Sequence, residues 1–205
     1  VLTKIHVLSY QRKDMSEPVS THDYDEMREF FLNEEVLVGH NIIRFDLVAV
    51  EKVLGVKPKA RLGDTLPLSW YLHHNRPKHG LEGYGEEYGV PKPKITDWDS
   101  LTPEDYAHRC EEDVKINTRL WNELRVKLTK LYQKEDYWRF IDYLSFKMDC
   151  ARQQEELGWM LDVEKAQAHF DDLVEQQAEK IEQLADTMPK RVLTKLAQRP
   201  KNMHK

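Results

Sequence analysis

The chain has 205 residues, a formal net charge of −5 at pH 7 and a hydrophobic fraction of 40%. This length suits one medium-sized domain, or one domain with an appendage, and supplies enough apolar residues for a buried core. No apolar run approaches the roughly 18 residues of a membrane span, so the sequence predicts no contact with a membrane interior. The two cysteines, Cys110 and Cys150, lack metal-ligand spacing and do not resemble a disulfide framework, which favours a cytoplasmic location.

Hydrophobic patterning predicts short strands alternating with helices along the first half of the chain. We expect strands over residues 4–11 and 36–39, and helices over residues 22–33, 44–55, 65–73 and 81–88. Gly55 and Gly89 are suitable helix ends. The run Thr102-Pro103-Glu104-Asp105 predicts a further helix start, because it combines a hydroxyl cap, a first-turn proline and acids near the positive end of the helix dipole. This helix should continue through Asp113 towards Leu131.

The composition changes after about Lys134. Residues 137–188 predict two helices separated by Gly158, with the second helix beginning near Asp162. Residues 189–205 contain six lysines and arginines and no acid: Lys190, Arg191, Lys195, Arg199, Lys201 and Lys205. We therefore expect three parts, with boundaries at 1–133, 134–188 and 189–205. The chain begins with Val1 rather than Met, and we interpret it as a piece of a longer protein.

Two aspartates occupy positions that suit a metal site. Asp46 follows the strand that ends at Gly39 and opens a helix, which places it at the sheet edge where ligands usually bind in α/β folds. The alternative interpretation is an ordinary acid that complements the helix dipole. Asp113 lies in a helix on the same stripe as Cys110 and Ile116, and a buried carboxylate needs a partner such as a metal or a nearby basic side chain.

The residues before Asp113 could take part in the same chemistry. His108 precedes Asp113 by five residues and suits a general base that activates water, although an exposed helix histidine is the alternative. Arg109 precedes Asp113 by four residues, one helical turn, and so shares its face. Arg109 could pair with Asp113 or contact a phosphate.

Four motifs, in the order given, carry a resemblance to a known family: Val38-Gly39-His40-Asn41 through Phe45-Asp46, Asp64-Thr65-Leu66, His79-Gly80-Leu81-Glu82-Gly83-Tyr84-Gly85, and Cys110-Glu111-Glu112-Asp113-Val114. They closely resemble the proofreading 3′–5′ exonuclease domain of family A DNA polymerases, and the spacing from Asn41 to Asp46 resembles the phage replicative enzymes. The segment 150–159 followed by Asp162 resembles the entry into the polymerase portion.

The resemblance implies an α/β, ribonuclease-H-like fold, a mixed sheet flanked by helices, with a C-terminal helical appendage. It also implies two Mg²⁺ or Mn²⁺ ions held by four acids, with Asp113 at the first metal and Asp46 at the second. By the same resemblance Asn41 and Phe45 contact the terminal nucleotides, and His79 and Leu81 border the substrate cleft.

The sequence departs from the family pattern in two places. The opening Asp-x-Glu motif should lie about a dozen residues before Lys4, upstream of this chain, so the chain alone should bind metal poorly. Arg109 stands where polymerase exonucleases usually carry Tyr, and an arginine cannot act as a base at neutral pH. His108 matches the spacing of the related group that uses histidine, and it is our expected base. Asp64 resembles a family position near the site, but we favour an N-cap role for it.

The resemblance implies single-stranded DNA and the primer 3′ terminus as partners, with the basic tail at 189–205 contacting the primer–template duplex at the start of the thumb region. Residues 1–133 would form the exonuclease domain, and residues 134–188 a helical connection to the polymerase. Two alternatives stay open. One is a catalytically inactive, DNA-binding structural module, and the other is an RNA-trimming exonuclease of the same superfamily.

Overall fold

The computed structural model describes residues 2–90, 95, 97, 101–132 and 136–188. It divides into two compact units, Val1–Leu157 and Gly158–Lys205. Among the described helices, none combines the length and the apolar character needed to cross a membrane.

The first unit contains two pairs of strands. Strand β1 (Leu8–Tyr10) pairs antiparallel with β2 (Val19–Thr21), and β3 (Val36–Gly39) pairs parallel with β4 (Arg61–Asp64). The register of the parallel pair sets Gly39 beside Asp64, so the carboxyl ends of β3 and β4 meet. The expected mixture of helices and strands is confirmed, and β3 has the predicted bounds, whereas β2 and β4 were not predicted and β1 is shorter than 4–11.

Helices form most of the first unit, close to the predicted ranges. They are α1 (Tyr24–Asn33), α2 (Asp46–Ala49) continued by the π-helical η1 (Val50–Leu54), α3 (Thr65–Leu72), α4 (Leu81–Tyr88), α5 (Pro103–Leu131) and α6 (Asp136–Leu157). Thr102 caps the start of α5, as the sequence predicted, and its reciprocal hydrogen bonds with Asp105 form a capping box that was not predicted. Gly55 and Gly89 end their helices in the left-handed conformation, with φ of 68° and 70°.

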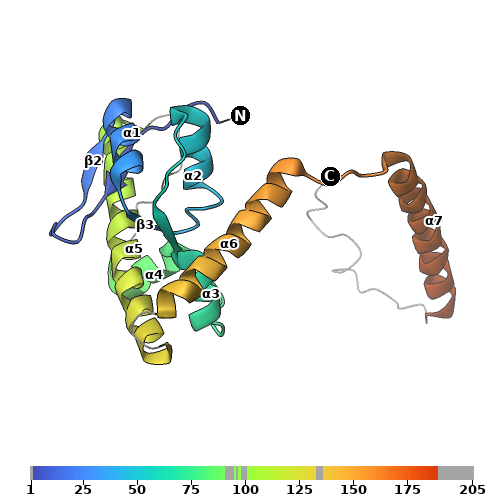
Figure 1. Ribbon diagram of the computed structural model, residues 1–205. Helices are drawn as coiled ribbons and strands as arrows, with labels where there is room; N and C mark the ends of the chain where they lie inside the picture. The colour runs from blue at the N-terminus through green and yellow to red at the C-terminus, as the bar shows by residue number, and fades with distance from the viewer. Residues whose placement is uncertain (1, 91–94, 96, 98–100, 133–135, 189–205) are drawn as a thin grey trace. The chain divides into compact units, whose positions relative to one another are not determined.

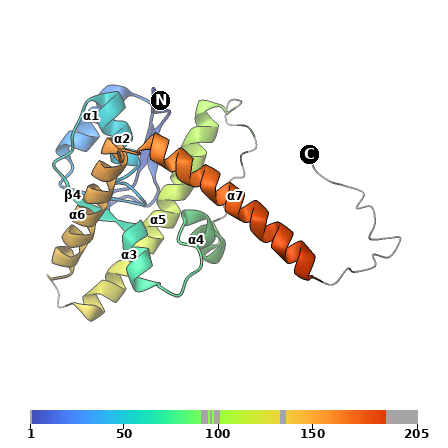
Figure 2. The same ribbon diagram turned by 90° about the vertical axis from the view of Figure 1, so that its right-hand side faces the viewer.

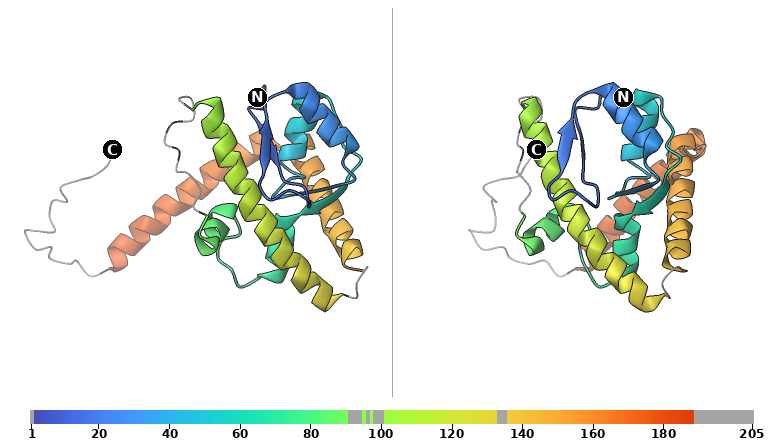
Figure 3. Two further views of the ribbon diagram at one scale, coloured as in Figure 1. Left: turned by 90° about the vertical axis from the view of Figure 1, so that its left-hand side faces the viewer. Right: turned by 60° about the vertical axis from the view of Figure 1, so that its left-hand side comes forward.

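Two hydrophobic clusters lie inside the first unit. The first joins α1, β3, α2 and η1, and the second joins α3, α4, α5 and α6. Helix α6 contributes Met148 to the first cluster and Ile141 to the second. It also packs on β4, where the Ser145 hydroxyl donates to the Leu62 carbonyl at 3.0 Å. The strands β3 and β4 thus lie between α5 and α6 (Figures 1 and 3). Residues 136–157 of the expected helical connection therefore pack together with β3, β4 and the helices α1 to α5 of the first unit.

Helix α4 approaches α5 very closely at Gly85. A Cβ atom at Gly85 would lie 2.5 Å from the Val90 carbonyl oxygen and 2.8 Å from Cδ1 of Ile116. Only glycine fits this helix crossing, and the contact fixes α4 against the middle of α5.

The second unit contains α7 (Val163–Thr187), a single uninterrupted helix (Figure 2). The predicted break and start are confirmed, since Gly158 has φ of 67° and the Asp162 side chain caps the helix by accepting from the Lys165 amide at 3.0 Å. The apolar side chains of α7 are exposed. The basic segment 189–205 lies outside the described residues.

Candidate active site

The candidate site begins at the turn that joins β3 to α2. Gly39 permits the turn, because a Cβ atom there would lie 2.7 Å from Cβ of Ile42. Asn41 adopts the left-handed conformation with φ of 62°, which asparagine tolerates better than most residues. The Phe45 amide then donates to the Asn41 carbonyl at 3.0 Å, so the chain reverses within a few residues and delivers Asp46 to the start of α2.

The Asp64 carboxylate anchors this turn to β4. Its oxygens accept hydrogen bonds from the backbone amides of Asn41 at 2.8 Å, Ile43 at 3.4 Å and Leu66 at 3.0 Å. Asp64 is almost fully buried, and burial raises its pKa, while these three amides and the charge of Arg44 lower it. The predicted N-cap role is confirmed by the bond from Leu66, and the two bonds to the turn add a second role that was not predicted.

Thr65 links the two strands to α5. Its hydroxyl lies 2.9 Å from Nδ1 of His40 and donates to Oδ1 of Asn117 at 2.6 Å. Asn117 follows Asp113 by one helical turn, so this bridge fixes the face of α5 that carries Asp113. Sequence reasoning gave no role to His40 or Asn117, because their contacts with Thr65 span 25 and 52 positions of the sequence.

Asp46 has the most perturbed carboxylate near this turn. The residue reaches solvent, but the surrounding protein crowds its carboxylate, and desolvation is the main reason that its pKa rises to about 7. A backbone hydrogen bond opposes the shift, and the negative charges of Asp64 and Asp113 add to it. Asp64 and Asp113 therefore each lie near enough to Asp46 to disfavour its charged form, although 67 positions separate Asp46 from Asp113 in the sequence.

Asp113 lies half-buried in α5, near both Asp46 and Cys110. Burial raises the pKa of the Cys110 thiol, hydrogen bonds with Ser9 oppose the shift, and the charges of Asp113 and Asp46 reinforce it. A thiol with a raised pKa stays neutral, so Cys110 can pack as a small apolar group. The structure thus brings together the two acids that the sequence singled out, on α2 and α5.

Two groups suited to nucleotide contact flank Asp46. The Phe45 ring is 63% exposed although it is a large aromatic side chain, and it immediately precedes Asp46. Oδ1 of Asn41 is buried and finds no hydrogen-bond partner among the residues that the structure describes. A buried acceptor of this kind calls for a bound group that donates to it. The two side chains could therefore offer a stacking surface and a hydrogen-bond acceptor.

His108 and Arg109 occupy different positions around α5. Five residues of helix turn the chain by about 140° relative to the starting face, so the exposed His108 lies on another face from Asp113. Arg109 is half-buried, four residues before Asp113, and shares its face as expected. The role of His108 as a general base stays a prediction.

His79 and Leu81 belong to the second hydrophobic cluster and its polar surroundings. Nδ1 of His79 lies 2.7 Å from the Ser69 hydroxyl, and Leu81 is a partly buried member of the packing around α4. His79 is not among the charged groups that perturb the pKa of Asp46. The predicted contacts of His79 and Leu81 with substrate stay predictions.

The acids of this site partly fit a divalent metal. Carboxylate oxygens are the ligands that Mg²⁺ and Mn²⁺ prefer, and a cation would relieve the repulsion between Asp46 and Asp113. Asp64 is already committed to three backbone amides. Within the described part of the chain, no three His, Cys, Asp or Glu residues are grouped so that they could hold a metal. The chain thus offers two of the four acids that the family resemblance implies.

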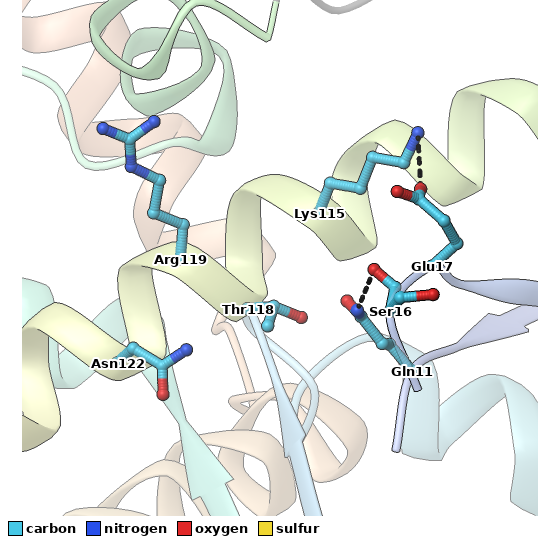
Figure 4. A pocket seen from close by; sticks show the side chains of 7 residues that line it. All are labelled: Gln11, Ser16, Glu17, Lys115, Thr118, Arg119 and Asn122. Atoms are coloured by element: carbon cyan, nitrogen blue, oxygen red, sulfur yellow. Dashed lines mark hydrogen bonds and ion pairs between the residues drawn. The ribbon is translucent and has the colours of Figure 1, made fainter. Parts of the chain in front are cut away.

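A pocket of about 370 Å³ lies elsewhere, between residues 11–17 and α5 (Figure 4). Its lining is polar and consists of Gln11, Ser16, Glu17, Lys115, Thr118, Arg119 and Asn122. Nζ of Lys115 is occupied by ion pairs with Glu17 at 3.3 Å and Glu112 at 3.0 Å. None of the predicted site residues lines this pocket.

No protein-family model matches the chain, and no curated protein is significantly similar to it.

Proposed function

We propose that the first unit is a ribonuclease-H-like 3′–5′ exonuclease domain of a DNA-directed DNA polymerase, which removes nucleotides from the primer 3′ end. The observation that carries the proposal is the convergence of Asp46 and Asp113. Asp46 follows the turn at the end of β3, where the carboxyl ends of β3 and β4 meet, and Asp113 lies near enough for its negative charge to raise the pKa of Asp46. Repelling carboxylates at such an edge are a suitable site for divalent cations.

Two Mg²⁺ or Mn²⁺ ions would supply an activated water and would stabilise the leaving oxygen of a phosphodiester. In this proposal Asp113 holds the first ion and Asp46 the second. The raised pKa of Asp46 leaves its carboxylate partly protonated near neutral pH, so it binds a cation only after losing that proton. The remaining ligands would come from the Asp-x-Glu motif that the resemblance places upstream.

Phe45 and Asn41 would hold the end of the DNA strand. The exposed Phe45 ring can stack on a base, and the buried Asn41 acceptor can receive a hydrogen bond from a nucleotide. Single-stranded ends should be preferred, because a base must leave its duplex stack to reach the ring. Arg109 would contact a phosphate on the same face of α5 as Asp113. His108 stays our candidate general base from the family spacing, although it lies on another face of α5.

A second candidate is a DNA-binding module without catalysis. The observation that favours it is the small number of acids, since Asp46 and Asp113 are too few to hold two ions. In this case Phe45 and Asn41 would bind a strand end that is not cleaved.

The test is the digestion of 5′-labelled single-stranded DNA in Mn²⁺ by the chain and by a form that carries the upstream Asp-x-Glu motif. We expect stepwise shortening from the 3′ end by the extended form, with activity reduced by at least about a hundredfold in Asp113→Asn. Glu104→Gln changes an exposed acid of the same helix and should keep full activity. An extended form that binds DNA without cutting it would favour the second candidate.

A further inference from the structure

A chain of hydrogen bonds runs between α5, α3, α4 and the loop that follows α3. It joins Lys127, His73, Tyr84, Ser69 and His79 in that order. Nζ of Lys127 contacts Nε2 of His73, Nδ1 of His73 lies 2.8 Å from the Tyr84 hydroxyl, that hydroxyl lies 2.6 Å from the Ser69 hydroxyl, and Ser69 lies 2.7 Å from Nδ1 of His79. His73, Tyr84 and Lys127 line a pocket of about 650 Å³, and little of the surface of Tyr84 or Ser69 reaches solvent.

Lys127 sets the direction of hydrogen-bond donation at one end of this series of hydrogen bonds, because an ammonium group donates hydrogen bonds and cannot accept them. Lys127 also forms an ion pair with Glu123 at 2.9 Å. Although burial works against it, hydrogen bonds from Lys127 and Tyr88 hold the pKa of Glu123 below its usual range. Nε2 of His73 must then accept from Lys127, which leaves the proton of the neutral imidazole on Nδ1.

Other charges around His73 agree with a neutral ring. Burial lowers its pKa most, Lys127 lowers it further, and Glu123, with a carboxylate oxygen 3.4 Å from Nε2, opposes them. Arg76 and His79 also lower the pKa of His73. The Lys127 ammonium and the Glu123 carboxylate both lie beside Nε2 of His73, and the ammonium can only donate a hydrogen bond there.

The direction of hydrogen-bond donation set at His73 then continues through the buried hydroxyl groups of Tyr84 and Ser69. Nδ1–H of His73 donates to Tyr84, so the Tyr84 hydroxyl proton turns to Ser69, and the Ser69 proton turns to Nδ1 of His79. The opposite order would require Nε2–H of His73 to face the Lys127 ammonium, donor against donor. Tyr84 and Ser69 are almost fully buried, which strengthens the hydrogen bond between their hydroxyl groups. His79 is left with its proton on Nε2, for which no hydrogen-bond partner is found among the described residues.

We propose that Lys127 is a positioning residue that acts through His73, Tyr84 and Ser69 to hold His79 as a neutral Nε2–H donor for an acceptor oxygen of bound DNA. The ordering of the chain follows from these contacts alone. Only the identity of the acceptor rests on the proposed nuclease function. Lys127 would therefore influence DNA binding without touching the DNA.

The ordering is tested by two-bond hydrogen–nitrogen NMR correlations, which report the protonated nitrogen of each histidine. We expect the Nδ1–H tautomer for His73 and the Nε2–H tautomer for His79. Lys127→Met should shift both histidines towards mixed tautomers, Lys127→Arg should restore the pattern because it keeps a donor, and Lys130→Met on the same helix should change nothing. Tyr84→Phe interrupts the chain and should uncouple His79 from position 127. An Nε2–H tautomer for His73 in the unchanged protein would overturn the proposal.

The functional step is tested by binding of a short single-stranded DNA to the same variants in a metal-free buffer. Lys127→Met should weaken binding about threefold to tenfold, as expected for the loss of one hydrogen bond, and Lys127→Arg should recover it. Equal DNA affinity in Lys127→Met would overturn the role in binding. A third outcome is that the histidine tautomers change with the residue at position 127 while the protein binds no DNA. This result would overturn the proposed nuclease function but would leave the ordered series of hydrogen bonds intact.

Discussion

The Asp64 carboxylate accepts a hydrogen bond from the Asn41 backbone amide at 2.8 Å, and this bond joins the end of β4 to the turn that precedes Asp46. The two residues are 23 positions apart in the sequence. The candidate site thus depends on an acid that belongs to its framework as well as on the acids that could bind a metal.

Replacing Asp64 should destabilise the fold. Asp64→Ala removes the acceptor of three backbone amides, and we expect the free energy of unfolding to fall by about 3 kcal/mol. Asp64→Asn retains one acceptor oxygen and should lose about half as much. Urea unfolding followed by circular dichroism measures both losses. A smaller loss in the alanine variant than in the asparagine variant would contradict the anchoring role.

Asp46 should make the metal-free protein less stable as pH rises. Its pKa is 3.8 ordinarily and about 7 in the folded protein, so between these values the folded state binds more protons than the unfolded state. The penalty is absent below the lower pKa and fully developed above the higher one. Asp46→Asn should therefore gain stability relative to the unchanged protein as pH rises through this window, which urea midpoints in a chelating buffer can follow.

Asp105 provides a control of opposite sign for that series. Hydrogen bonds from Thr102 lower the pKa of Asp105, so its contribution to stability develops as pH rises above the folded-state pKa and is lost on acidification. Asp105→Asn should lose stability relative to the unchanged protein as pH rises. The same sign for both variants would show that the two carboxylates do not differ in environment as described.

Phe45 should contribute to DNA binding and very little to the fold. Its ring is 63% exposed, and loss of one base–aromatic stack weakens binding by about 1–3 kcal/mol. We expect Phe45→Ala to reduce affinity for single-stranded DNA by at least about fivefold with little change in melting temperature. Phe146 on α6 is equally exposed, at 64%, and Phe146→Ala is the matched control. Equal losses of DNA affinity in the two variants would show that Phe45 does not stack on a bound base.

The helices were predictable because their ends carry local signals. The cap at Thr102, the left-handed glycines at 55 and 89 and the cap at Asp162 act over a few residues, so the sequence alone shows them. The strands β2 and β4 have three and four residues and are fixed by partners elsewhere in the chain. Such short segments carry little periodicity of their own.

The same difference between local and distant contacts explains which residues of the candidate site could be predicted from the sequence. Asp46 and Asp113 were recognisable from motif spacing, and the structure brings them near each other. The hydrogen bonds between Asp64 and the turn and between Thr65 and Asn117 join residues up to 52 positions apart. No local sequence pattern predicts such bonds.

The central claim is that Asp46 and Asp113 act as one cation-binding unit, and the most direct test is the Mn²⁺-induced rise in melting temperature. The rise should be larger at about pH 8 than at about pH 5.5, because Asp46 must lose its proton before it binds a cation. Asp46→Asn and Asp113→Asn should each remove most of the rise, and the double variant should lose no more than either single variant. A rise that is independent of pH, or that survives either substitution, would contradict the claim.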